Sequence, residues 1–373
     1  MIQHLLEILV GIYLIPAVSG QSRSFFDMNC PRNIFVNLRK CEVFVESRLD
    51  FTDFRQWTSE LESAVKVSLD VTCKSKGVFF LPWPMKARGL IELNVKGCVL
   101  AGYFSESLTP TNLKDELLEL SLENCVIAGN VKHSIDAFNK PVTNEIDCGQ
   151  QTLKRSVWRN ISYTNTNDMD GVTIDDFLKF FSSLDQFLNN INRIKYRCKY
   201  SNLEYIDESM GSNRNKHSFL MMTAYSDFPK LHTFLWTYNG YSSVPQELTD
   251  WRKYFPQLKL LDLSYNNITK FNFLGAPFTE MVSKSEPLVI DLTHNSVTEI
   301  PVDMLDYFTG SVPIIVDLTG NPLRCDCNFI RYKNYVMQAL KIFQKYGNLS
   351  RITCRSVIMH RKIQLVNYSN NNC

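Results

Sequence analysis

Residues 258–268 read Leu-Lys-Leu-Leu-Asp-Leu-Ser-Tyr-Asn-Asn-Ile, which is the pattern L-x-x-L-x-L-x-x-N-x-I. The pair Leu261 and Leu263 places two apolar side chains on the same face of a short strand. Asn266 follows them and is expected to turn inward, where its amide satisfies backbone groups at the bend after the strand. The same phrase recurs at residues 231–241, 290–297 and 316–323, so four copies stand in phase.

This pattern is the leucine-rich repeat. In the first half of the chain, residues 90–100 and 117–127 carry it with Cys98 and Cys125 in place of the asparagine, because a buried thiol is small and apolar. Weaker copies fit residues 67–72 and 146–153. The turn positions fall at residues 72, 98, 125 and 151, and then at 239, 266, 295 and 321, in steps of 26 to 29 residues.

The repeats predict an α/β solenoid over residues 61–323. It is a leucine-rich repeat horseshoe with a parallel β-sheet on the concave face, an irregular or helical convex side and disulfide-capped ends. Within it, residues 152–227 are irregular, and the spacing leaves room for about three further units between positions 151 and 239. The best candidate there is residues 196–206. Phe177, Phe181, Leu184, Leu188 and Ile191 recur at helical spacing. Polar residues 160–170 and 212–216 predict loops, which are either a binding insertion or, more commonly, degenerate repeats.

Cysteines mark both ends of the solenoid. Cys325, Cys327, Cys354 and Cys373 resemble the C-terminal cap of extracellular leucine-rich repeat proteins, which covers residues 324–373. That resemblance implies Cys325–Cys354 and Cys327–Cys373 pairing, although four cysteines alone allow three connectivities. Caps of this family usually hold a tryptophan, and Tyr332 or Tyr335 takes its place here.

The N-terminal cap is expected over residues 21–60 with Cys30 and Cys41. Cys73 either belongs to this cap or is free, and the thiols of Cys98, Cys125, Cys148 and Cys198 are expected to be buried without a partner. Eleven cysteines leave at least one thiol unpaired.

The chain carries signs of a secretory route. Residues 1–20 look like a signal peptide, with an apolar run too short to span a membrane and small residues for cleavage. Sequons predict glycosylation of Asn160, Asn267, Asn348 and Asn367. No other apolar run is long enough to span a membrane, and the chain stops at the last cysteine of the cap. We therefore expect a secreted protein, or else an ectodomain without its tail.

Strand residues that point away from the core should form columns along the concave face. The proposed ligand-binding residues are Thr237, Tyr238, Asp262, Tyr265, Asp291 and His294. Asp262, Asp291 and Asp317 should stack at the spacing of parallel strands, about 4.8 Å. One interpretation is a site for a cationic ligand. The alternative, which is favoured, is that Leu-Asp-Leu is a consensus phrase of the repeat and that His294 is an ordinary surface histidine.

Catalysis is not expected, because the sequence has no phosphate-binding glycine loop, no G-x-S-x-G and no H-E-x-x-H. No metal or cofactor site is predicted, since Cys325 and Cys327 are better explained by the cap than by zinc. A formal net charge of +2 indicates neither a nucleic-acid partner nor a strongly acidic one.

Residues 228–373 resemble Toll-like receptor ectodomains and other secreted leucine-rich repeat proteins, and residues 65–155 share only the pattern. The membrane helix and cytoplasmic domain of Toll-like receptors are missing from this chain. The resemblance implies extracellular binding of a protein or microbial ligand, in an innate immune role. The alternative is a structural matrix or cell-adhesion protein. The ligand and the oligomeric state cannot be read from the repeats, because they supply a scaffold.

Overall fold

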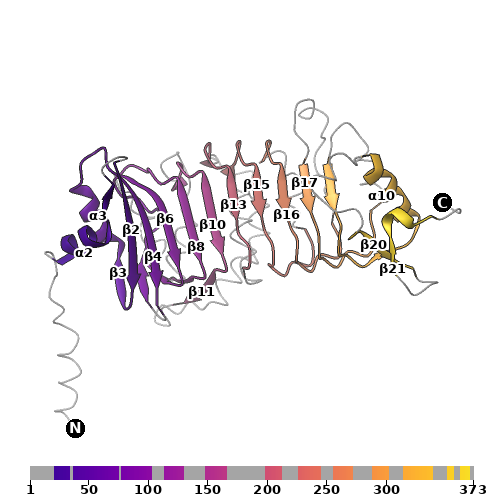
Figure 1. The fold of residues 1–373 in the computed structure, drawn as a ribbon, viewed down its shortest axis with the longest axis horizontal. Helices are drawn as coiled ribbons and strands as arrows, with labels where there is room; N and C mark the ends of the chain where they lie inside the picture. Colours follow the sequence, from indigo (N-terminus) through magenta and orange to yellow (C-terminus); the bar gives the residue numbers. More distant parts are fainter. Residues whose placement is uncertain are drawn as a thin grey trace, which may run out of the picture.

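The computed structural model describes residues 21–33, 37–74, 77–102, 113–129, 148–165, 198–211, 226–244, 255–271, 288–301, 314–338, 351–356 and 362–369. One long sheet runs along the whole molecule, with its strands side by side in a row (Figure 1). Its strands, in spatial order, are β1 (Arg32–Asn33), β2 (Leu38–Val45), β4 (Lys66–Cys73), β6 (Leu90–Lys96), β8 (Glu119–Glu123), β10 (Arg155–Arg159), β13 (Tyr205–Asp207), β15 (Thr233–Leu235), β16 (Leu260–Asp262), β17 (Leu288–Asp291) and β18 (Ile314–Asp317). Every neighbouring pair is parallel except β1 and β2. The chain is therefore a leucine-rich repeat solenoid.

The N-terminal half of the solenoid has a second parallel sheet. Its strands are β3 (Arg48–Asp50), β5 (Val78–Phe80), β7 (Val99–Ala101), β9 (Val126–Gly129) and β11 (Ser162–Asn165). Each coil there contributes one strand to each sheet, and the core lies between the two. Leu93, Val95, Leu120 and Leu122 are all at most 1% exposed, as their repeat positions predict.

The C-terminal half uses a ladder of asparagines in place of the second sheet. Nδ2 of Asn266 donates to the carbonyls of Trp236 (2.9 Å) and Leu263 (3.0 Å). Its Oδ1 accepts the N–H groups of Asn239 (2.9 Å) and Tyr241 (3.2 Å). Asn239, Asn295 and Asn321 bond in the same way. The inward amide thus joins neighbouring coils, and the predicted role of the repeat asparagine is confirmed.

Cysteine can replace asparagine in the first half because backbone pairing already satisfies the bend. The N–H of Ile268 needs the side chain of Asn295, whereas the equivalent residue Ile127 lies in β9, which pairs with β7 and β11. The thiol of Cys125 is a weak donor, and it donates to the carbonyls of Glu123 (3.3 Å) and Val95 (3.6 Å). Burial raises the pKa of this free thiol.

Disulfides join Cys30 to Cys41, Cys73 to Cys98, Cys148 to Cys198 and Cys325 to Cys354. The prediction of free buried thiols at Cys98, Cys148 and Cys198 is therefore wrong. Cys73 ends β4 beside the next coil, so its Cα lies 4.9 Å from that of Cys98. Cys148 and Cys198 are 50 residues apart in the sequence and tie the irregular region together. Cys327 is disulfide-bonded, and its predicted partner Cys373 lies outside the described residues.

The predicted register is wrong at three places. In the first coil the inward pair is Leu69 and Val71, which align with Leu93 and Val95, and Thr72 is exposed. The coil predicted at residues 146–153 has its strand at β10 instead, and the coil predicted at 196–206 has its strand at β13. These two strands are the only ones of the described long sheet between β8 and β15, so the described sheet has fewer coils there than the spacing predicts.

The misplaced coil at β10 has unusual core residues. Ser156 and Trp158 align with the inward Leu120 and Leu122, and Trp158 Nε1 donates to Ser156 Oγ at 3.0 Å. That hydrogen bond lets a polar residue occupy a core position. Residues 162–165, predicted as part of a loop, form β11 and pair with β9. The helix predicted around Phe177–Ile191 and the loop at 212–216 lie outside the described residues.

Caps close both ends of the row of coils (Figure 1). At the N-terminal end α2 (Gln21–Asn29) packs on α3 (Phe51–Ser59), whose first turn is capped by the carboxylate of Asp50. Phe26 stacks on Trp57 between them. The signal peptide predicted at 1–20 lies outside the described residues. No helix in the described part of the chain is long and apolar enough to cross a membrane.

The C-terminal cap contains β19 (Leu323–Arg324), α10 (Cys327–Gln338), β20 (Thr353–Arg355), β21 (Lys362–Gln364) and the 3-10 turn η8 (Leu365–Asn367). Elsewhere in the chain, the short strands β12 (Cys198–Lys199) and β14 (Ser226–Asp227) pair with each other as a separate sheet. Tyr332 of α10 is fully buried, and its hydroxyl donates to the carbonyl of Val316 in β18 at 2.7 Å. Tyr332 therefore anchors the cap to the last coil.

Candidate binding face

The outer face of the long sheet carries four stripes of side chains in its C-terminal half. Register places outward residues of β15 to β18 at the same level in successive coils. The apolar stripe is Thr233, Leu260, Val289 and Ile315; the acidic stripe is Leu235, Asp262, Asp291 and Asp317; the hydroxyl stripe is Thr237, Ser264, Thr293 and Thr319; and the aromatic stripe is Tyr238, Tyr265 and His294. Val289, Ser264, Ile315, Asp317 and Thr319 are buried, so the accessible part of these stripes lies on the coils of β15 to β17.

The aspartates of the acidic stripe hold the turn that follows each strand. Oδ1 of Asp262 accepts the N–H of Ser264 at 2.9 Å, and Asp291 and Asp317 accept the N–H two residues on at 2.8 and 2.9 Å. These bonds give a structural reason for the Leu-Asp-Leu phrase and support its interpretation as a consensus of the repeat. Burial, followed by the charges of Asp262 and Asp317, raises the pKa of Asp291 to about 6.

The aromatic stripe is a continuous ring stack. The rings of Tyr238 and Tyr265 lie 4.5 Å apart and 8° from parallel, and those of Tyr265 and His294 lie 4.5 Å apart at 15°. All three residues have a left-handed backbone, with φ of 56°, 55° and 55°, which turns their side chains out at the edge of the sheet. Tyr238 is 49% exposed and Tyr265 is 43% exposed.

Gly320 ends this stack. It occupies the same turn position in the next coil with φ of +80°, and a Cβ there would lie 2.7 Å from His294 Nδ1. The absence of a side chain therefore gives His294 room to stack on Tyr265. His294 has a defined place in the stack and is not simply an isolated surface residue.

The structure brings all six proposed ligand-binding residues onto this one surface. Thr237 belongs to the hydroxyl stripe, Asp262 and Asp291 to the acidic stripe, and the other three to the aromatic stripe. Their binding role is taken up below as a proposal.

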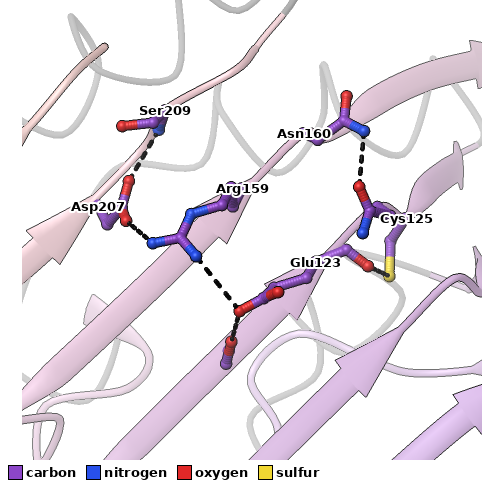
Figure 2. A network of polar contacts seen from close by, with 8 residues as sticks. Glu123, Cys125, Arg159, Asn160, Asp207 and Ser209 are labelled. Atoms are coloured by element: carbon purple, nitrogen blue, oxygen red, sulfur yellow. Dashed lines mark hydrogen bonds and ion pairs between the residues drawn. The ribbon is translucent and has the colours of Figure 1, made fainter. Parts of the chain in front are cut away.

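A charged cluster in the middle of the same face was not predicted (Figure 2). The guanidinium of Arg159 on β10 bonds to the buried carboxylate of Asp207 and lies 3.7 Å from Glu123. Oδ1 of Asp207 accepts the N–H of Ser209 at 3.0 Å. Beside it, the guanidinium of Arg155 lies 3.9 Å from the centre of the Tyr205 ring.

The cluster was missed because the register was wrong in this region. A signal was present in the sequence, since Arg159-Asn160-Ile161 repeats the turn phrase Glu123-Asn124-Cys125. Asn124 and Asn160 both have left-handed φ of 52°, and Nδ2 of Asn160 donates to Oδ1 of Asn124 at 2.7 Å.

The sequons within the described residues lie off the striped surface. Asn160 and Asn267 are exposed in the bends after β10 and β16, and Asn367 is exposed in the C-terminal cap. Asn348 lies outside the described residues. In the same described part of the chain, no three His, Cys, Asp or Glu side chains gather as a metal site.

Comparison with known proteins gives a partial match. A segment of 108 residues, 28% of the chain, is 32% identical to Protein toll of Drosophila melanogaster and spans 10% of that protein's length. The crystal structure of human 5T4 (Wnt-activated inhibitory factor 1, Trophoblast glycoprotein) is similar with a TM-score of 0.46 and 17% identity, over 91% of this chain and 95% of that one. No family model matches. The coils, the disulfides and the match to Protein toll fit an extracellular leucine-rich repeat protein with cysteine-rich caps.

Proposed function

We propose that this protein is a secreted recognition protein that binds a protein partner on the accessible part of these stripes, on the coils of β15 to β17. The observation that carries the proposal is the exposed stack of Tyr238, Tyr265 and His294 beside the carboxylates of Asp262 and Asp291. Exposed tyrosines bury large areas at small entropic cost and are frequent hot spots of protein interfaces. An exposed aromatic stack of this kind supports a binding role for the protein.

Charge indicates what the partner offers. The acidic stripe lies between an apolar stripe and a hydroxyl stripe, neither of which carries a cation. A partner with a lysine or arginine beside apolar side chains would place its charge on Asp262 and Asp291 and its apolar atoms on Leu260. Such a cation would favour the ionised form of Asp291, whose pKa is raised in the free protein.

The resemblance to Toll-like receptor ectodomains supports an innate immune setting, with a microbial or host protein as the ligand. Four disulfides among the described residues support an oxidising, extracellular compartment. The class of ligand follows from the stripes, and the immune role follows from the resemblance alone.

The test begins with capture of a partner from the native body fluid on immobilised secreted protein. Binding of that partner is then measured for Tyr238→Ala with Tyr265→Ala, which should weaken it at least tenfold. The matched control is Met28→Ala with Phe44→Ala, which removes exposed apolar side chains (75% and 65%) at the far end of the solenoid. Undiminished affinity in the folded tyrosine variant, with loss in the control, would place the site elsewhere.

A further inference from the structure

Charge is divided unequally along the chain. Residues 324–373, the region of the C-terminal cap, contain nine lysines and arginines but only one acidic residue, Asp326. This region therefore has a formal charge of +8, whereas the whole chain has +2, so the remaining residues together carry −6. The near-neutral sum conceals a strongly basic end of the molecule, and such an asymmetry is typical of a protein that binds a polyanion.

Part of this charge is gathered on one face of the three-stranded sheet of the cap. Strand register places Arg324 on β19 beside Arg355 on β20, and Arg355 beside Lys362 on β21. All three residues are exposed, while their strand neighbours Leu323 and Cys354 are buried and belong to the core. These three cations, the basic row, therefore stand side by side on the outer face at the spacing of neighbouring strands, about 4.8 Å.

Little in the surroundings neutralises the basic row. Arg324 pairs with Glu299, but the two side chains are 59% and 60% exposed, so solvent screens the pair. Among the described residues, no carboxylate forms a salt bridge with the other two cations of the row. Like charges on neighbouring strands repel each other. The row therefore lowers the stability of the cap until an anion lies across it.

The acidic residue of the cap is used for another purpose. Asp326 caps the first turn of α10, where its Oδ1 accepts the N–H of Phe329 at 2.9 Å. A further cation, Lys333, is also used internally, because its ammonium group donates to the carbonyls of Val366 (2.9 Å) and Tyr368 (2.8 Å). The basic row is distinct from these structural charges, since it makes no comparable contact that orders the cap.

We propose that the basic row binds a sulfated polysaccharide of the heparin class, with the sugar chain lying across β19, β20 and β21. A guanidinium group forms charge-assisted, bidentate hydrogen bonds with oxyanions, so Arg324 and Arg355 suit sulfate groups. The ammonium group of Lys362 adds a third charge at the end of the row. A linear polyanion can thus follow the row from strand to strand and remove the repulsion within it.

The choice of a polysaccharide over a lipid surface rests on the secreted location proposed above. Anionic lipids give the cytoplasmic leaflet of a cell membrane its negative potential, and a secreted protein does not meet that leaflet. Clusters of lysine and arginine are typical of heparin-binding patches. The acidic stripe on β16 and β17 repels a polyanion, so the cap and the striped face take partners of opposite charge. Exposed Met337 and Val366 in the same cap make a lipid surface the alternative outcome of the test.

The test measures the affinity of the full secreted chain for a heparin fragment over a range of salt concentrations. Arg355→Gln with Lys362→Gln should weaken binding at least about tenfold at low salt, and should reduce the slope of log K against log salt by about two, because two ionic contacts are lost. The matched control is Lys230→Gln with Lys270→Gln, which removes the same charge from exposed positions of the solenoid and should leave the affinity unchanged. Thermal melts confirm that each variant is folded.

A footprint on the natural protein tests the same contact without a variant. A saturating heparin fragment should protect Lys362 from acetylation and leave Lys230 and Lys270 reactive, as measured by peptide mass spectrometry. The variant Tyr238→Ala with Tyr265→Ala should bind heparin like the natural protein. Failure of the polysaccharide site and failure of the protein-binding stripes are therefore separate results.

Any of three results would overturn the proposal. The first is unchanged heparin affinity in the folded variant Arg355→Gln with Lys362→Gln. The second is unchanged reactivity of Lys362 in the presence of saturating heparin. The third is binding to vesicles that contain phosphatidylserine without binding to heparin, which would make the cap a contact for a lipid surface.

Discussion

At the scale of single residues, aspartate does the same job in four of the coils. Asp207, Asp262, Asp291 and Asp317 each accept the N–H two residues on, at 2.8 to 3.0 Å, and so fix the turn after the strand. The cost is a row of carboxylates at the spacing of neighbouring strands. Asp207 is relieved by Arg159, but Asp291 lies between two other carboxylates, which together with burial raise its pKa to about 6.

Asp291→Asn is therefore expected to stabilise the protein at neutral pH. The amide oxygen can still accept the N–H of Thr293, and the repulsion disappears. Because the folded pKa of Asp291 is raised, the ionised carboxylate destabilises the native state above about pH 6, and this effect fades as pH falls toward 4. Thermal melts should show a gain of about 1 kcal/mol at pH 7.5, allowing for partial exposure, and little gain at pH 4. A loss at pH 7.5, as expected for Asp291→Ala, would show that the second carboxylate oxygen is needed.

At the scale of elements, the two halves solve the same problem in different ways. Each coil must satisfy the N–H and C=O groups at the bend out of the long sheet. In the first half β5, β7, β9 and β11 do so by pairing, and in the second half the asparagine ladder does so with side chains. Cysteine is therefore tolerated only where the second sheet exists.

This difference predicts unequal effects of truncation at one repeat position. Asn266→Ala leaves the N–H groups of Asn239 and Tyr241 without their acceptor inside the core, at a cost of at least about 2 kcal/mol. Cys125→Ala removes a weak thiol donor, while Leu100, the equivalent of Tyr241, stays in the strand pairing of β7 with β5 and β9, so about 1 kcal/mol is expected. Urea unfolding of both secreted variants measures the difference. Equal losses would mean that the second sheet does not substitute for the ladder.

The same elements show what the sequence could predict. Coils with aliphatic pairs, such as Leu93 with Val95 and Leu261 with Leu263, were placed correctly because burial at period two leaves a clear pattern. The coils of β10 and β13 were misplaced because their core positions hold Ser156, Trp158 and Glu208, which a hydrophobic pattern does not detect. The six residues of the proposed site were brought together because they lie in well-marked coils. Their ring stack depends on left-handed turns and on Gly320, which the pattern alone does not reveal.

At the scale of the whole molecule, each coil is stabilised mainly by its contacts with the neighbouring coils. A solenoid has few contacts between distant parts, so each end depends on its cap. The C-terminal cap is joined by the Cys325–Cys354 disulfide and by the Tyr332 hydroxyl on Val316. Leu323 and Cys354 also pair between β19 and β20. Damage to this cap should therefore spread inward from one end.

Cys325→Ala with Cys354→Ala is the variant that separates this behaviour from global unfolding. The disulfide closes a loop of 29 residues in sequence separation, so its loss should cost about 3 kcal/mol. Hydrogen exchange should rise most in residues 314–338, less in 255–271, and remain unchanged in 38–74 and 90–102, where the second sheet and the Cys73–Cys98 disulfide hold the coils together. A uniform rise along the chain would mean that the coils unfold as one cooperative unit. A graded rise from the C-terminal end would mean that the proposed binding face, on β15 to β17, depends for its order on the cap that covers β18.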